Sequence, residues 1–442
     1  MLDLSHVFAG PYIGALLADL GAEVIKIEAP HRLDQSRSTF SPFFENDPGA
    51  APWDRAGAFH NVNRGKRSLA LDLATAAGRE LLRGLVAESD VLLESFTPRV
   101  MRGWGMTHDA LAALNPRLIM LSNTGFGSTG PWSAFRAQGT TLEATMGLTG
   151  LAGHADGPPS KVGQSYPDFL ACWSGLLALM AALVHRERTG EGQWIDLGMY
   201  QLGAAVIPEA LLRHQLTGEE EPRGGALEPG VRFAGVFPAA GLDRWLALSV
   251  FTDDQLAALG AAVGCDGADD LPDAVAAWVC SRERAAAAAI LQEAGVPAGP
   301  VLDARDLFEE RQLYERGFYE PARFADGVKR LLIGRPYRWQ GGRTAVATRG
   351  PGPDFGEGAA WVLEEVLGLD RAAASALRAA GVVTDAPVGM APVEPLDLAV
   401  MLRSGALIRI DDDYAAVLAA AGAGAGRSRP HTAARANRRE SG

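Results

Sequence analysis

Two kinds of segment, each with its own pattern of apolar and polar positions, alternate over the first two hundred residues. Short apolar runs predict strands at Leu2–Leu4, Glu23–Glu28, Ser68–Leu73, Val91–Glu94 and Arg117–Ser122. The segments between them predict helices, of which the first begins at Gly10-Pro11 and ends at Gly21, where proline and glycine are favoured. Strands that alternate with helices indicate a parallel sheet covered on both faces. We therefore expect an α/β, doubly wound large domain.

The pattern changes at Thr217–Gly230, which is acidic, rich in Gly and Pro, and without periodicity. Beyond it, short strands and helices predict a small α+β domain, and two helices over 359–381 return to the first unit. The expected division is a large domain over 1–205, a linker over 206–230, a small α+β domain over 231–295, a linker and return to the large domain over 296–386, and an extra C-terminal segment over 387–442. That last segment contains an Ala/Gly-rich run followed by five arginines over 427–439, which predicts that it is largely disordered.

Composition narrows the functional classes. The 442 residues carry a formal net charge of −12, which disfavours a dedicated nucleic-acid binder. The three cysteines lack CxxC spacing and fit a reducing compartment, so the cytoplasm is expected, and nothing at the N-terminus has the pattern of a signal peptide. The longest apolar run, Phe169 to Val184, falls short of the ~20 residues that a membrane span needs and predicts a buried helix.

Three familiar motifs are weak or missing. Gly125–Gly130 matches GxGxxG, but Pro131-Trp132 follows where a dinucleotide site needs a helix, so a tight turn is the better interpretation. The eight histidines are scattered without ligand spacing, so no metal site is expected. No serine lies in a GxSxG elbow.

Two segments carry chemistry that spacing alone leaves open. Asn63–Ser68 places three cations in four residues, which fits a solvated turn and phosphate recognition equally well. Asp168 precedes the long apolar helix, where an N-cap is the ordinary role of aspartate. The helix dipole also keeps such a carboxylate ionised, as a nucleophile requires. Cys172, one turn later, is better explained by packing than by catalysis.

Together, several segments resemble the class III CoA-transferase family over roughly residues 1–386. The matching segments are 2–11 (LDLSHVFAGP), 17–28 (LADLGAEVIKIE), 63–72 (NRGKRSLALD), 115–118 (NPRL), 125–127 (GFG), 157–159 (GPP), Asp168 and 185–192 (HRERTGEG). The resemblance implies an acyl-CoA:carboxylate CoA-transferase, with a Rossmann-like large domain and an interlocked dimer. A heteromer with a paralogous subunit is the alternative assembly.

The resemblance also assigns roles to residues. Asp168 takes the place of the catalytic nucleophile, an acyl-CoA and a carboxylic acid are the implied substrates, and neither a metal nor a permanently bound cofactor is implied. The positions that correspond to coenzyme A contacts are His6, Phe8, Ala9, Leu71, Asp72, Leu73, Ala74, Ser95, Phe96, Thr97, Arg102, Phe135, Arg136, Ala137 and Gln138.

Some of these positions depart from the family pattern. Phe8 and Ala74 stand where formyl-CoA transferases carry Gln and Lys, so Arg99, Arg102 and Arg136 are the cations left to meet the CoA phosphates. Gly139 offers no proton-transfer group where racemase relatives have an acid/base residue, which favours transfer over racemisation. A CoA-ester racemase or isomerase on the same fold, and a non-catalytic CoA-binding paralogue, stay as alternatives.

Overall fold

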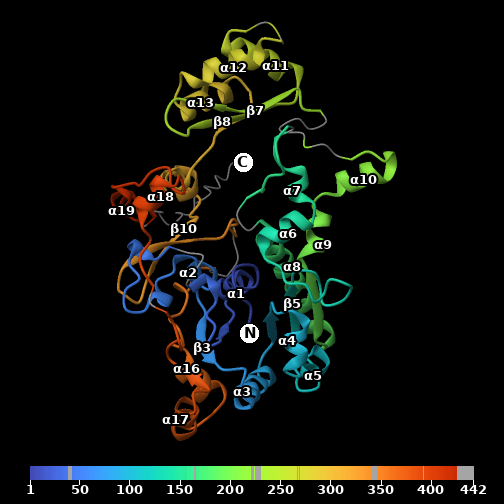
Figure 1. The fold of residues 1–442 in the computed structure, drawn as a ribbon, viewed down its shortest axis with the longest axis vertical. Coiled ribbons are helices and arrows are strands. Elements are labelled where there is room, and N and C mark those ends of the chain that lie inside the picture. The colour runs from blue at the N-terminus through green and yellow to red at the C-terminus, as the bar shows by residue number, and fades with distance from the viewer. Residues whose placement is uncertain are drawn as a thin grey trace, which may run out of the picture. The chain divides into compact units, whose positions relative to one another are not determined.

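The computed structural model describes residues 1–37, 42–154, 156–163, 166–220, 223, 230–265, 267, 269–339, 346–391 and 393–425. The chain divides into two compact units (Figure 1). Unit 1 comprises Met1–Met146, Gly163–Val206 and the chain from Arg311 onward, and unit 2 comprises Gly147–Val162 and Ile207–Glu310.

A seven-stranded sheet forms the centre of unit 1. Its strands run in the order β12-β3-β2-β1-β4-β5-β6, and all neighbours are parallel except the pair β12 and β3. The bounds are β1 Leu2–Asp3, β2 Ile25–Glu28, β3 Arg67–Leu71, β4 Val91–Glu94, β5 Ile119–Thr124, β6 Gln193–Gly198 and β12 Val383–Thr384. From β1 the chain adds β2 and β3 on one side and then returns to the other side with β4. Such a reversal opens a ligand crevice at the carboxyl ends of β1 and β4.

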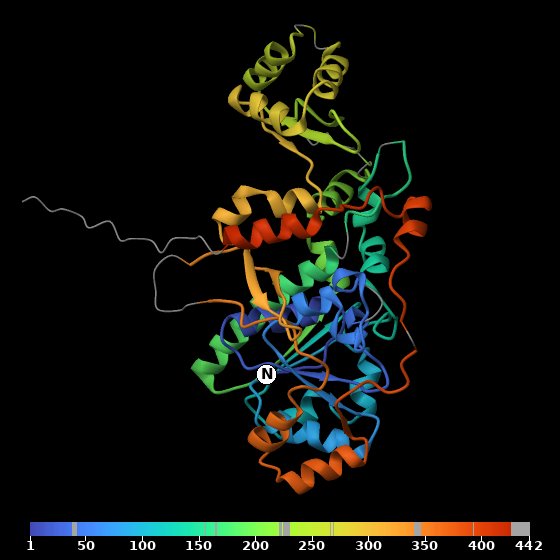
Figure 2. The same cartoon turned by 90° about the vertical axis from the view of Figure 1, so that its left-hand side faces the viewer.

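Helices cover both faces of this sheet (Figure 2). One face packs against α1 (Ala9–Asp19), α2 (Gly57–Val62) and α8 (Tyr166–Thr189). The other packs against α3 (Ala76–Ala87), α4 (Pro98–Gly103), α5 (His108–Ala112), α16 (Ala359–Trp361) and α17 (Arg371–Ala379), with a π-helical turn over Val362–Val366. The prediction of an α/β fold with a parallel sheet is therefore confirmed.

Helix α8 is longer than predicted, with 24 residues, and its length and composition alone would allow it to cross a membrane. Cys172, Leu176 and Leu179 are buried against the sheet, together with residues of α1. One face of α8 is therefore part of the core of unit 1.

The rest of unit 1 comprises α6 (Gly139–Thr145), α9 (Met199–Ala205), α15 (Arg311–Glu315) and a β10–β11 hairpin (Tyr319–Arg323 and Lys329–Ile333). Two further helices, α18 (Leu398–Arg403) and α19 (Tyr414–Ala425), lie in the extra C-terminal segment. The predicted disorder of 387–442 therefore does not hold for these helices, and residues 426–442, with the arginines noted above, lie outside the described residues.

Unit 2 has its own core between an antiparallel sheet and helices. The sheet consists of β7 (Phe233–Pro238), β8 (Trp245–Val250) and β9 (Ala298–Pro300), and its core residues come also from α11 (Asp253–Val263), α12 (Leu271–Cys280) and α13 (Arg284–Glu293). The helices α7 (Leu148–Leu151), α10 (Pro208–Thr217) and α14 (Ala304–Glu309) complete the unit.

The predicted boundaries need three corrections. Residues 147–162 group with unit 2, whereas the sequence predicts that they belong to the large domain. Residues 296–310 also stay with unit 2, because β9 pairs with β8. The expected linker 206–230 contains helix α10, while residues 221–222 and 224–229 lie outside the described residues.

Candidate active site

Two loops predicted to bind CoA meet at the carboxyl ends of β1 and β4. The backbone N–H of His6 donates to the Ser95 hydroxyl oxygen over 3.1 Å, and the rings of His6 and Phe96 lie 5.7 Å apart between centroids. These contacts lie at the switch point of the sheet, where the topology favours a ligand. The structure therefore brings together residues that are 89 positions apart in the chain.

Asp168 lies in the first turn of α8, and α8 packs beside α1. It is the third residue of the helix, so the N-cap role that spacing suggested does not apply. Burial raises the pKa of the half-buried Asp168 carboxyl to about 6, although the backbone N–H groups of Ala9 and of Asp168 itself donate to the carboxylate and oppose this effect. Because Ala9 is the first residue of α1, the N-terminus of α1 faces the Asp168 carboxylate of α8.

A buried set of charges lies beneath the turn that leads into α1. Lys66 Nζ is 2.6 Å from Asp3 Oδ2, and Lys26 Nζ is 3.0 Å from Asp34 Oδ2, with all four side chains inaccessible to solvent. Burial disfavours the Asp3 carboxylate, but the charges of Lys66 and Lys26 outweigh burial and hold its pKa below the usual range. Burial lowers the pKa of Lys66 to about 8, so this pair is ionised at neutral pH.

These charges hold the backbone of the turn. Asp3 accepts hydrogen bonds from the backbone N–H (2.9 Å) and the hydroxyl of Ser5, and Lys26 donates to the Ser5 carbonyl oxygen. Asp34 Oδ1 accepts the Val7 N–H over 3.1 Å. Asp3, Lys26 and Asp34 have no predicted role, although a charged residue between apolar neighbours in a predicted strand, as in Leu2-Asp3-Leu4 and Ile25-Lys26-Ile27, is a usable signal.

The other predicted CoA contacts differ in how accessible they are. The Leu71 and Leu73 side chains are buried in the hydrophobic core, whereas Asp72 and Ala74 lie in the turn after β3. Phe135, Arg136 and Gln138 are exposed just before α6, and Ala137 packs against Gly125 at the end of β5. The exposed Arg102 lies on α4.

The cations of 63–68 have structural partners. Arg64 pairs with Asp19 over 2.7 Å and Lys66 with Asp3, all fully buried, so neither a solvated turn nor phosphate recognition describes these two residues. Arg67 is partly exposed, and its guanidinium lies 4.5 Å from the centre of the Trp361 ring.

Cys172 and the GxGxxG segment fit their simpler interpretations. Cys172 is fully buried, and burial raises its thiol pKa to about 12, which leaves it protonated and unreactive. Gly127 and Gly130 adopt left-handed backbone angles (φ 86° and 84°) in a tight turn, and the next helix, α6, starts only at Gly139. Among the described residues, no cluster of His, Cys, Asp or Glu could hold a metal ion.

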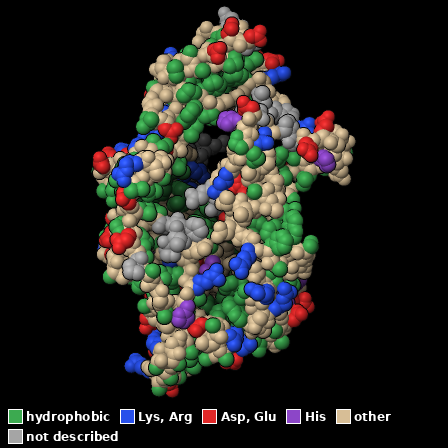
Figure 3. Space-filling view, viewed as in Figure 1, with side chains coloured by type: hydrophobic (Ala, Val, Ile, Leu, Met, Phe, Trp, Pro, Cys, Tyr) green, Lys and Arg blue, Asp and Glu red, His purple; other side chains and the backbone are tan. Residues whose placement is uncertain are grey.

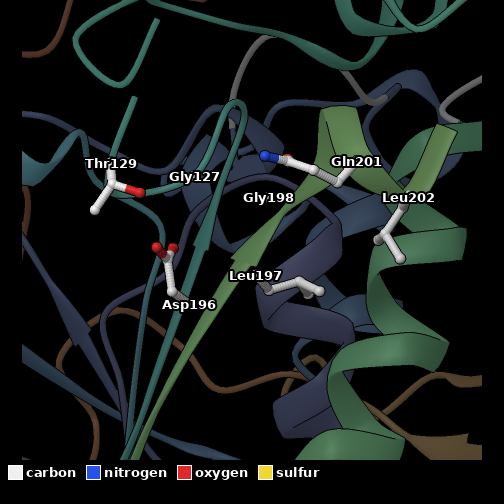
Figure 4. A pocket seen from close by; sticks show the side chains of 7 residues that line it. All are labelled: Gly127, Thr129, Asp196, Leu197, Gly198, Gln201 and Leu202. Carbon is white, nitrogen blue, oxygen red and sulfur yellow. The ribbon is translucent and has the colours of Figure 1, made fainter. Parts of the chain in front are cut away.

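The GxGxxG turn borders a cavity of about 280 Å³ at the carboxyl ends of β5 and β6 (Figure 4). The Asp196 carboxylate accepts the Ser128 N–H with both oxygens, at 2.9 and 3.0 Å, and thereby fixes the turn. Gln201 and Leu202 of α9 lie across the cavity from Asp196 and Thr129.

A second cavity, of about 220 Å³, lies between β4, β5, α4 and α5, and Glu94 and Arg102 are among its lining residues. Glu94 Oε2 accepts the Phe96 N–H over 2.8 Å, and burial raises the pKa of Glu94 to about 7. This carboxyl group therefore holds the backbone of the loop that follows β4.

The fold is that of an α/β protein with a mostly parallel central sheet, and comparison with known proteins identifies its family. The model of CoA-transferase family III matches residues 1–358. The chain belongs to this family, as the sequence resemblance predicted.

Named relatives and a solved structure agree with this assignment. The chain is 32% identical to a succinate–glutarate CoA-transferase of Agrobacterium fabrum, over 84% of this chain and 96% of the relative. It is 30% identical to the beta subunit of a succinyl-CoA–L-malate CoA-transferase of Chloroflexus aurantiacus, over 84% and 93%. A crystal structure of a CAIB/BAIF family protein from Brucella suis superposes with a TM-score of 0.73 at 29% identity and covers 83% of this chain and 97% of that one.

The buried Lys66–Asp3 pair leads to a first prediction. Lys66→Met leaves the Asp3 carboxylate buried without its nearest cation, which should lower the free energy of unfolding in urea by about 3–5 kcal/mol. Arg67→Met, one residue away and partly exposed, is the matched control and should cost no more than about 1 kcal/mol. Equal stability of the two variants would show that Lys66 has no such structural role.

Proposed function

We propose that this protein transfers CoA between carboxylic acids through covalent aspartyl intermediates on Asp168. One observation carries the proposal: the Asp168 carboxylate is half-buried, receives the N–H of Ala9, and belongs to the helix beside the predicted CoA loops. A desolvated carboxylate that is still ionised at neutral pH suits nucleophilic attack.

The proposed reaction proceeds in covalent steps. An Asp168 oxygen attacks the thioester carbonyl of the donor, the C–S bond breaks, and the thiolate of CoA leaves with the electron pair. The thiolate then attacks the aspartyl carbonyl of the mixed anhydride and expels the donor acid as its carboxylate. The acceptor carboxylate attacks the carbonyl of the resulting aspartyl-CoA thioester and expels the CoA thiolate. The thiolate then attacks the acyl carbonyl of this second mixed anhydride, which yields the new acyl-CoA and free Asp168.

Each tetrahedral intermediate places negative charge on an oxygen that needs a hydrogen-bond donor. The Ala9 N–H already donates to the Asp168 carboxylate and is the best-supported donor for intermediates formed at the aspartyl carbonyl. A backbone N–H at the start of a helix also benefits from the positive end of the helix dipole.

CoA is proposed to lie along the loops after β1, β3 and β4 and the segment 135–138. Support comes from the His6–Ser95 hydrogen bond and from the exposed Arg99, Arg102 and Arg136. Basic side chains gather near α4 on the face drawn in Figure 3. Arginine suits phosphate recognition, so these residues are the proposed partners of the CoA phosphates.

The substrates are proposed to be short dicarboxylic acids and their CoA thioesters, because the relatives above are named for succinate, glutarate and L-malate. No permanently bound cofactor is required by the proposed steps. A cytoplasmic location fits the three cysteines, which are all free thiols.

A second copy of the chain is the proposed partner of α8. The helix buries one apolar face against the sheet, yet Phe169, Leu177, Met180 and Val184 on its other side are 39–73% exposed. An apolar stripe of this length on a monomer marks an interaction site. A related chain is named as the beta subunit of an assembly, so a heteromer is the alternative outcome of the test.

Trapping with hydroxylamine tests the covalent step. The wild-type protein with succinyl-CoA should form a hydroxamate at Asp168, detectable by peptide mass spectrometry, and should transfer CoA to glutarate or L-malate. Asp168→Ala should lose both, whereas Glu187→Gln, an exposed change on the same helix, should retain both. A wild-type protein that forms no adduct across a broad acyl-CoA panel contradicts the proposal.

The pKa of Asp168 predicts the pH dependence of the reaction. Its raised value of about 6 means that the nucleophile becomes protonated as the pH falls through 6. We expect kcat/KM to be level above pH 7 and to fall about tenfold per pH unit below pH 6. Circular dichroism at each pH serves as the control for folding, and a rate that stays level down to pH 5 in folded protein would argue against Asp168.

Leu177→Glu tests the assembly. Leu177 is 73% exposed, so a charge is tolerated in an isolated chain but not within an apolar interface. We expect the wild type to be a dimer by light scattering and the variant to be a monomer with an unchanged circular dichroism spectrum. Glu187→Gln is again the control, and a monomeric wild type contradicts the homodimer.

A further inference from the structure

The turn that leads into α1 has a conformation that its sequence does not favour. Val7 has φ +72°, in the left-handed region that β-branched residues rarely adopt. Non-glycine residues persist there only when the surroundings hold them, and such residues cluster at functional sites. Ala9, whose N–H donates to Asp168, follows two residues later.

Three polar contacts hold this turn in place. Asp34 accepts the Val7 N–H over 3.1 Å, Ser95 accepts the His6 N–H over 3.1 Å, and Lys26 donates to the Ser5 carbonyl oxygen. Asp34 is itself fixed, because its side chain is buried, pairs with Lys26 at 3.0 Å and accepts two hydrogen bonds from Ser36. Without these contacts, Val7 would gain free energy by returning to negative φ.

We infer that Asp34 is a positioning residue that holds Val7 in its strained conformation and thereby aims the Ala9 N–H at the Asp168 carboxylate. The inference rests on the proposed function of Asp168 and names residues that act on it indirectly. If the turn relaxes, the Ala9 N–H swings away and the carboxylate loses a donor to its charged form. Its protonation midpoint then rises.

Few other groups disturb this midpoint. The shift of Asp168 is set by burial and by the two N–H donors. Tyr12 on α1 and Cys172 on α8 are neutral below pH 8, because burial raises the pKa of both. His6 in the turn has its pKa lowered by burial, and Lys66, Lys26 and Arg64 are held in the buried ion pairs below.

The test measures protonation of Asp168 without any acyl-CoA. A carbodiimide activates protonated carboxyl groups, so amidation of Asp168 with glycinamide, followed by peptide mass spectrometry from pH 4.5 to 7.5, gives its midpoint. Asp34→Ala should raise this midpoint by roughly one pH unit and lower kcat about tenfold with little change in KM. Asp34→Asn keeps an acceptor for the Val7 N–H and should leave the midpoint near that of the wild type.

A double variant separates strain from a general loss of structure. Glycine adopts positive φ without penalty, so Val7→Gly combined with Asp34→Ala should recover at least half of the midpoint shift. Ser36→Ala is the matched control, because the Ser36 hydroxyl donates to the same Asp34 oxygen that accepts the Val7 N–H. It should leave the midpoint unchanged even if it lowers the melting temperature.

Other outcomes overturn the inference. A folded Asp34→Ala protein with the wild-type midpoint shows that the contact does not aim the N–H, and a double variant without recovery shows that strain at Val7 is not involved. If Asp34→Ala does not fold, Ser95→Ala removes the acceptor of the His6 N–H without exposing a buried charge, and the same midpoint criteria apply with and without Val7→Gly. If Asp34→Ala shifts the midpoint as expected but hydroxylamine traps no adduct in the wild type, the covalent step of the proposed function is refuted and the positioning role of Asp34 is not.

Discussion

Four buried charges beneath the first strand–helix turn are the constraint on which the candidate site depends. Asp3, Lys26, Asp34 and Lys66 have no access to solvent, so each charge is tolerable only while its partners keep their places. Those partners include the backbone of Ser5 and Val7. The electrostatic cost of opening this cluster therefore keeps the turn, and with it the N-terminus of α1, in a single geometry.

The sheet could be predicted from the sequence because its strands are buried on both faces and appear as short apolar runs. β4 has the predicted bounds, and the ends that differ in the other strands of the first 125 residues are shifted by one or two residues. In the small domain the sequence predicts helices at 252–259 and 285–294 but not α12, at Leu271–Cys280, because the apolar residues of α12 follow an acidic, irregular stretch. The antiparallel partner of β3, the two-residue strand β12, is too short to leave a pattern.

The site was predictable only in part, for a physical reason. Local spacing could not distinguish a solvated Asn63–Ser68 turn from a phosphate site, and the real partners of Arg64 and Lys66 are Asp19 and Asp3, 45 and 63 residues away. Ion pairs between residues far apart in the chain leave no local periodicity. Asp168 emerged from the family resemblance, whereas spacing alone predicted an N-cap that the helix, which starts two residues earlier, does not use.

The two helix ends that meet at Asp168 explain how its carboxyl group can be both partly desolvated and ionised at neutral pH. Burial weakens the solvation of the carboxylate and raises its pKa, while the N–H groups of Ala9 and of Asp168 stabilise the charge. With burial alone the group would be protonated over more of the neutral range, and with more donors it would be a weaker nucleophile. The pKa of about 6 therefore depends on the position of the N-terminus of α1. The buried charges beneath the preceding turn fix that position.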